Sequence, residues 1–317
     1  MTLVMQKFRQ TIIIISIIIS ILFLLFIKAH AVEADLEADY DVIFNHRDAE
    51  KDDFGPGTYQ YPQNEIFQNK GNLFDIRVFT ILESDNDYLF KFDFTRLTDP
   101  WNSKYEFSLP LIELYIDNDQ GGSNNPFYRG ANISFEEGFS WNKFLKISGW
   151  WVRIFNPNSK ERAVFNLNEI SSEDPYQSET ADVSIEDNTI NLKISKSELG
   201  SLDSSKFVLL IGSFDPFGYD HFRSFSEEKS SWQIYTETEL DINKIPRVMD
   251  ILVPEGRSQR EILSEEFAEI PSFAVNNAAA AEKENGISNI NRAVDLLFII
   301  YILFVMGIIY YYRQKKY

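Results

Sequence analysis

Near the start of the chain, four carboxylates lie within six residues, at Asp48, Glu50, Asp52 and Asp53, shortly before a Gly-Pro-Gly turn at residues 55–57. Hard cations such as Ca²⁺ are bound by oxygen ligands that turns and loops supply. This segment therefore predicts a calcium site with Asp52 and Asp53 as ligands. The alternative is a solvated acidic loop in a chain that carries a net charge of −18.

A second candidate calcium loop lies at residues 117–121, DNDQG, which have the D-x-D-x-G opening of a calcium-binding loop. Asp117 and Asp119 are the predicted ligands there. An EF-hand ends its loop with a bidentate carboxylate, and the residue at that position is Tyr128. The sequence thus excludes an EF-hand and leaves a calcium loop of another kind.

The chain has five tryptophans, and each is a candidate for stacking on a sugar ring. Sugar sites use flat aromatic faces, with acids and amides nearby to bind the hydroxyl groups. Trp101 and Trp141 have polar neighbours in the sequence, which predicts that they lie exposed in loops, and Trp150 is the third candidate. The alternative for each tryptophan is packing in the core.

Catalytic chemistry has little support in the sequence. The chain has no cysteine, and beyond residue 31 its histidines are His46 and His221, far apart in the sequence. The absence of cysteine excludes both a thiolate nucleophile and a metal site with thiolate ligands. Acids are too widespread to single out a pair for glycoside hydrolysis. The strongly acidic body would also repel phosphate backbones, so we expect neither an enzyme nor a nucleic-acid-binding protein.

The elements that must position these residues read as strands. Aromatic residues alternate with others over residues 88–95, and apolar residues alternate over 190–194 after a turn, which predicts a strand and a hairpin. Further strand-like segments lie at residues 109–117, 144–155 and 207–214. One helix is predicted at residues 258–268, where Ser258 and Glu261 have the spacing of a capping box. The pattern predicts an all-β fold, a β-sandwich.

The two ends of the chain are apolar. Residues 12–27 follow Lys7 and Arg9 and precede an A-x-A site, which predicts a signal peptide at residues 1–31, with an uncleaved anchor as the alternative. Residues 296–312 are apolar, end in three tyrosines and are followed by basic residues, which is typical of a membrane span. We expect a transmembrane helix at residues 294–312, a cytoplasmic tail at 313–317, a tether at 274–293 and an extracellular domain at 32–273.

Two segments carry a resemblance to a known family, DDFGPGTYQYP at residues 52–62 and PRVMDILVPEGRSQREILS at 246–264. Between them the motifs DPW, LYIDND with a following GG, and SGWW occur in the same order. Over residues 40–271 the chain resembles the glucodextranase C-terminal domain. The sequence departs from the family pattern at Ala49 and Lys51, where members usually carry Pro and Gly.

The resemblance implies a non-catalytic β-sandwich similar to family 9 carbohydrate-binding modules and to the DOMON group. Such domains accompany glucan-degrading enzymes or stand at the cell surface. We therefore expect a protein anchored in the cell membrane that binds a glucan or another polysaccharide. The alternative is a structural envelope protein that contacts an S-layer or another protein and binds no sugar.

Overall fold

The computed structural model describes residues 40–68, 71–118, 121–127, 130–159 and 176–275. The predicted signal peptide, transmembrane helix and cytoplasmic tail, and nearly all of the predicted tether, lie outside these residues. Within the described ranges, no helix has the length and apolar character that a membrane crossing requires.

The first sheet has five strands, and its aromatic alternation forms one side of the core. In β3, Tyr88, Phe90, Phe92 and Phe94 are at most 1% exposed, as the period of two predicts. The predicted hairpin is formed by β8 and β9. The strand order is β1 (Asp41–Arg47), β2 (Ile76–Glu83), β3 (Asp87–Phe94), β9 (Thr189–Ser195), β8 (Asp182–Glu186).

The second sheet has β4 at its centre, and β4 is buried along its whole length because both faces of the sheet are covered. The predicted strand at 144–155 is in fact two strands, since residues 148–151 form a turn. The strand order is β13 (Val248–Ile251), β10 (Lys206–Ser213), β4 (Pro110–Asp117), β6 (Lys143–Ile147), β7 (Val152–Phe155), with β15 (Phe273–Ala274) also pairing with β10.

The two sheets pack face to face around a core rich in phenylalanine. Phe207 of the second sheet lies with its ring centroid 4.6 Å from that of Phe44 and 5.4 Å from that of Phe79, both in the first sheet. Such offset and edge-on ring pairs add to the free energy of apolar burial. The described residues thus form a β-sandwich with few helices, as the sequence predicts.

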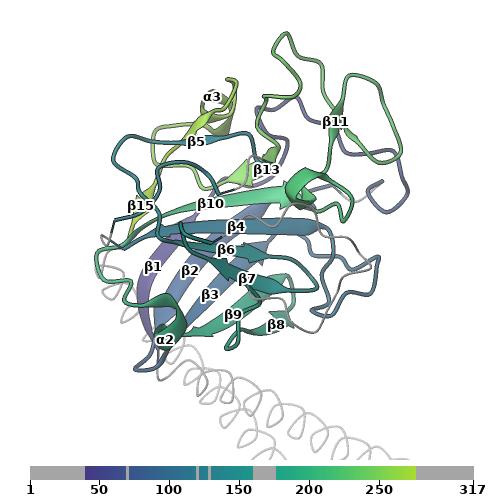
Figure 1. The fold of residues 1–317 in the computed structure, drawn as a ribbon. Coiled ribbons are helices and arrows are strands. Elements are labelled where there is room, and N and C mark those ends of the chain that lie inside the picture. The colour runs from purple at the N-terminus through teal and green to yellow at the C-terminus, as the bar shows by residue number, and fades with distance from the viewer. Residues whose placement is uncertain (1–39, 69–70, 119–120, 128–129, 160–175, 276–317) are drawn as a thin grey trace, which may run out of the picture. The chain divides into compact units, whose positions relative to one another are not determined.

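The other face of the second sheet carries a second core, which the sequence did not predict. Phe135, Ile262 and Ile270 are buried in it, and they come from short elements that lie over the sheet (Figure 1). These elements are β5 (Ser134–Phe135), α3 (Gln259–Ile262) and β14 (Glu269–Ile270). Because this extra layer covers the outer face of the second sheet, β4 is buried on both of its faces.

The predicted helix at 258–268 is present only as the four residues of α3. The predicted cap is confirmed: the Ser258 hydroxyl accepts from the Glu261 amide, and the Glu261 carboxylate accepts from the Ser258 amide. The predicted length is wrong, because the helix ends at its C-cap, Leu263, and the chain then turns again at Phe267, where φ is 49°, into β14, which pairs with β5.

Several loops meet at one end of the second sheet. The last residue of β10, Ser213, pairs with the first residue of β4, Pro110. The end of β6, Ile147, pairs with Val152 at the start of β7 and with Ile112 near the start of β4. Because these strands are antiparallel, the loops at residues 97–108, 148–151 and 214–224 emerge at the same end.

Candidate functional site

The three nominated tryptophans differ in burial. Trp141 is 1% exposed and lies in the second core, with its ring centroid 5.5 Å from that of Tyr115. Its indole N–H donates to the carbonyl of Asn125 over 2.7 Å. The expectation that Trp141 is exposed in a loop is therefore wrong. Its polar sequence neighbours predicted exposure, but residue 141 pairs with Ser123 and its ring packs in the second core.

Trp101 and Trp150 are brought together at the loop end of the second sheet. Both are partly buried, and their ring centroids are 6.2 Å apart. Trp150 also stacks on Phe214 at 5.0 Å. The turn that carries Trp150 needs glycine beside it, because a Cβ at Gly149 would lie 1.7 Å from the carbonyl oxygen of Phe107. The DPW and SGWW motifs are thus neighbours in space.

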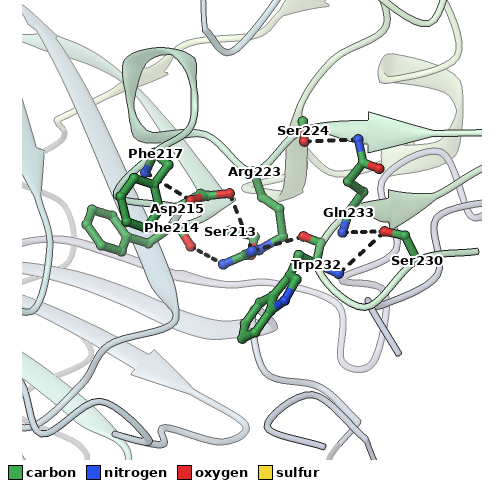
Figure 2. A network of polar contacts seen from close by, with 9 residues as sticks. All are labelled: Ser213, Phe214, Asp215, Phe217, Arg223, Ser224, Ser230, Trp232 and Gln233. Carbon is green, nitrogen blue, oxygen red and sulfur yellow. Dashed lines mark hydrogen bonds and ion pairs between the residues drawn. The ribbon is translucent and has the colours of Figure 1, made fainter. Parts of the chain in front are cut away.

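Arg223 connects the loop at residues 214–224 to the loop that carries Trp232 (Figure 2). Its side chain is 2% exposed. The guanidinium donates to the carbonyls of Phe214 over 2.5 Å and Trp232 over 2.9 Å, and to the hydroxyl of Ser213 over 3.0 Å. Asp215 lies 3.5 Å from it as the paired charge. Burial lowers the pKa of Arg223 to about 10, so the side chain remains a cation at neutral pH.

Three exposed aromatic side chains belong to the two loops that Arg223 connects. Phe217 is 83% exposed, Tyr219 55% and Trp232 49%. The Phe217 amide donates to the Asp215 carboxylate, and the Trp232 carbonyl accepts from Arg223. Trp232 lies between β11 (Phe225–Ser226) and β12 (Ile234–Tyr235), whereas Tyr219 opens the one-turn helix η2 (Tyr219–His221). We call the following residues the aromatic end: Trp101, Trp150, Phe217, Tyr219 and Trp232.

Sequence reasoning missed the exposed members of the aromatic end. Trp232 is one of five tryptophans and has no sequence neighbour that distinguishes it, and neither Phe217 nor Tyr219 is among the predicted site residues. A usable signal was present, because both aromatics occur in DPFGYD at 215–220, among turn-forming residues where side chains rarely reach a core.

A buried ion pair supports the loop that carries Tyr219. Lys146 of β6 lies 2.9 Å from Glu113 of β4, and both side chains are 1% exposed. Lys146 also donates to the carbonyl of Asp220 over 2.6 Å. Burial raises the pKa of Glu113, and the ammonium of Lys146 opposes that rise. The second sheet thus holds η2 by a charged contact.

The carboxylates predicted to bind calcium lie elsewhere, where the chain after β1 meets β13. Ligand atoms of Asp48, Asp52 and Asp250 all lie within 4.8 Å of one another. Asp53 and Asp75 are also near, since each contributes to the electrostatics of Asp52 or Asp250. We call these five residues the acidic cluster. The sequence indicated Asp48, Asp52 and Asp53, but not Asp75 or Asp250.

Hydrogen bonds hold the acidic cluster in place. The amides of Ile76 and Ile251 donate to the two oxygens of Asp250, and the amide of Val253 donates to Asp48. Asp53 accepts from the Tyr61 hydroxyl and the Phe74 amide. Asp75 accepts from the amides of Lys51 and Asp52 and from the Thr95 hydroxyl.

Four carboxylates of the acidic cluster have raised pKa values and so resist ionisation, those of Asp48, Asp52, Asp53 and Asp250. Burial raises the pKa of Asp48 to about 7, and burial with the charge of Asp75 raises that of Asp52 to about 6. Burial raises the pKa of Asp53 to about 6, against the hydrogen bonds from Tyr61 and Phe74. The pKa of Asp250 is raised well above its usual value, first by burial and then by Asp52 and Asp48. These carboxylates therefore repel one another when ionised.

The second predicted calcium loop is described only in part. Asp117 is 7% exposed, and its carboxylate accepts from the amide of Ser140 over 2.9 Å. Asp119 lies outside the described residues. The ligand role of these two residues stays a prediction.

The described residues form a β-sandwich whose loops at one end present aromatic side chains. A family model described as the C-terminal binding module, SLH-like, of glucodextranase matches residues 43–276, and the chain belongs to this family. The match confirms the resemblance carried by the hallmark motifs and is to a binding module rather than to a catalytic domain. A search of curated proteins finds no match.

Proposed function

We propose that this protein is a non-catalytic, carbohydrate-binding module that takes a glucan or another polysaccharide at the aromatic end. The observation that carries the proposal is the exposure of Phe217, Tyr219 and Trp232 on the two loops that the buried Arg223 connects. Exposed aromatic faces are costly in water and mark binding surfaces when they gather. Membership of a binding-module family supports the same reading.

The chemistry of the aromatic end suits a sugar. Trp232 and Phe217 offer flat faces for the C–H side of pyranose rings, while Asp215 and Gln233 offer polar groups near them for hydroxyls. The Arg223 network fixes the main chain of both loops, so little conformational entropy would be lost on binding. Trp101 and Trp150, being partly buried, would form the floor of the site.

We also propose that the module is displayed outside the cell on a single membrane span. Support comes from the apolar residues 296–312 with the basic residues after them, and from the apolar residues 12–27 before an A-x-A site. The rival is a structural envelope protein, which the SLH-like part of the family description favours. Such a structural protein would bind no sugar at the aromatic end, whereas a carbohydrate-binding module would.

The deciding experiment is a glycan-array screen of the purified full-length chain, followed by titration of the best ligand. Trp232→Ala and Phe217→Ala should each weaken binding at least about tenfold while leaving the unfolding midpoint near that of the unmodified protein, because exposed side chains contribute little to folding.

The matched control is Phe267→Ala, since Phe267 is 46% exposed but precedes β14 rather than lying in a loop of the aromatic end. Binding should be unchanged in this variant. Equal loss in all three variants, or no glycan bound by the unmodified chain, would reject the sugar site and favour the structural rival.

A further inference from the structure

The acidic cluster contains buried carboxylate oxygens that the described residues leave without a hydrogen-bond donor. They are Oδ2 of Asp48, Oδ1 of Asp52 and Oδ1 of Asp53. Asp48 is 6% exposed and Asp53 is fully buried. A buried anionic oxygen without a partner costs free energy, and native proteins rarely leave such groups unsatisfied.

The charge of the cluster is also uncompensated within the described part of the chain. None of the ion pairs there includes any of its five carboxylates. Elsewhere in the same fold, buried charges are paired, as Glu113 is with Lys146 and Asp215 with Arg223. The acidic cluster is therefore an exception that calls for a cation.

We infer that Asp48, Asp52 and Asp250 bind one calcium ion that ties the two sheets of the sandwich together. All three offer carboxylate oxygens and no nitrogen or sulfur, which selects a hard cation. Ligand oxygens on opposite sides of Ca²⁺ lie up to about 5 Å apart, whereas those around Mg²⁺ lie at most about 4.2 Å apart. Separations of up to 4.8 Å are spanned by the larger ion.

The surroundings support a built site. Backbone amides orient Asp250 through both oxygens and Asp48 through Oδ1, which leaves Oδ2 of Asp48 for the ion. Asp52 is only partly buried, so it offers an access route from solvent. Asp52 and Asp48 follow β1 of the first sheet, whereas Asp250 belongs to β13 of the second, and an ion between them would join segments about 200 residues apart in the sequence.

The test uses the full-length chain, treated with chelator and then dialysed. Adding CaCl₂ should raise the unfolding midpoint by several degrees, and metal analysis should find an ion that Asp52→Asn and Asp48→Asn do not retain. Asn keeps the shape of each side chain and removes the repulsion, so both variants should fold without calcium and lose most of the calcium-dependent shift.

Two controls make the assignment specific. Asp85→Asn changes an exposed residue in the β2–β3 turn and should retain the full calcium shift. Asp117→Asn tests the other acidic loop and should also retain it. MgCl₂ at the same concentration should give a smaller shift, and an equal one would overturn the assignment to calcium. If either Asn variant cannot be purified, the other serves alone. The site is rejected if chelator and calcium leave the unmodified protein unchanged, or if the two Asn variants respond as fully as Asp85→Asn.

Discussion

Lys51 has a backbone conformation that suits glycine, which is the residue that the family usually carries at this position. Its φ is 68°, in the left-handed region, and its amide donates to Asp75 over 2.6 Å. A side chain in this region costs about 1 kcal/mol. The departure from the family pattern thus keeps the turn and adds strain.

We expect Lys51→Gly to increase the free energy of unfolding by about 0.5–1 kcal/mol, because release of strain outweighs the added freedom of the unfolded chain. Urea unfolding at 0.5 M NaCl, where lost surface charge is screened, measures the effect. Ala49→Gly is the matched control, since residue 49 has no positive φ and should lose stability by a similar amount. A loss in both variants would contradict the strain.

His221 is a second residue with a measurable consequence. Burial, with Lys146 and Arg153 nearby, lowers its pKa to about 3, and its ring stacks on Phe214 at 5.8 Å. Below about pH 6.5 His221 therefore binds a proton in the unfolded chain but remains neutral in the folded chain until the pH nears 3. The resulting stability is complete above pH 6.5 and is lost as the pH falls toward 3.

His221→Gln should remove this dependence. Compared with the unmodified protein, the variant should gain relative stability as the pH falls from 6.5 to 4, by at most about 1.4 kcal/mol per pH unit. Chemical unfolding of both proteins at several pH values gives the difference, in which contributions from the carboxylates cancel. A difference that does not change with pH would mean that His221 is protonated in the folded state.

At the scale of elements, the Glu113–Lys146 pair joins β4, β6 and the η2 loop within the second core. Lys146→Met alone should cost about 3–5 kcal/mol, because it leaves a buried carboxylate without its partner. The double change Glu113→Leu with Lys146→Met should restore most of that stability, since two apolar groups replace two charges. Thermal unfolding of the three proteins checks this, and a double variant no better than the single one would show that the pair itself stabilises the fold.

Most elements could be predicted from the sequence because burial imposes a period on each strand. The alternation in β3 and β9 places every second residue in one core, so both strands can be predicted from the sequence. The second core was not predictable in this way, because its cover consists of elements two to four residues long such as β5, β14 and α3. Elements that short carry no period.

In the candidate sites too, residues that are close in the sequence could be predicted, whereas residues brought in by strand pairing could not. Asp52 and Asp53 stand out because acids crowd together in the sequence, whereas Asp250 joins them only through the pairing of β13 with the second sheet. A lone acid inside the apolar segment VMDILV was a hint of a buried role. The polar neighbours of Trp141 gave the wrong expectation, because exposure depends on what a loop folds against.

At the scale of the whole molecule, the proposed topology makes a direct prediction. Protease added to intact cells should digest the sandwich and spare a tag placed after Tyr317, because the basic residues at 313–316 favour the cytoplasmic side. The mature chain should begin at Val32. Loss of the tag would reverse the proposed orientation, and a chain that still begins at Met1 would mean that residues 12–27 act as an anchor.

Arg223 binds the main-chain carbonyls of Phe214 and Trp232, in addition to the side chains of Ser213 and Asp215. Every amino acid has such a carbonyl, so the contacts of Arg223 depend on the side chains of Ser213 and Asp215 but not on those displayed at positions 217, 219 and 232. Positions 217, 219 and 232 could therefore be randomised together in a selection library without disturbing the scaffold beneath them. By the same logic, related proteins could diverge quickly in ligand preference while keeping one arginine constant.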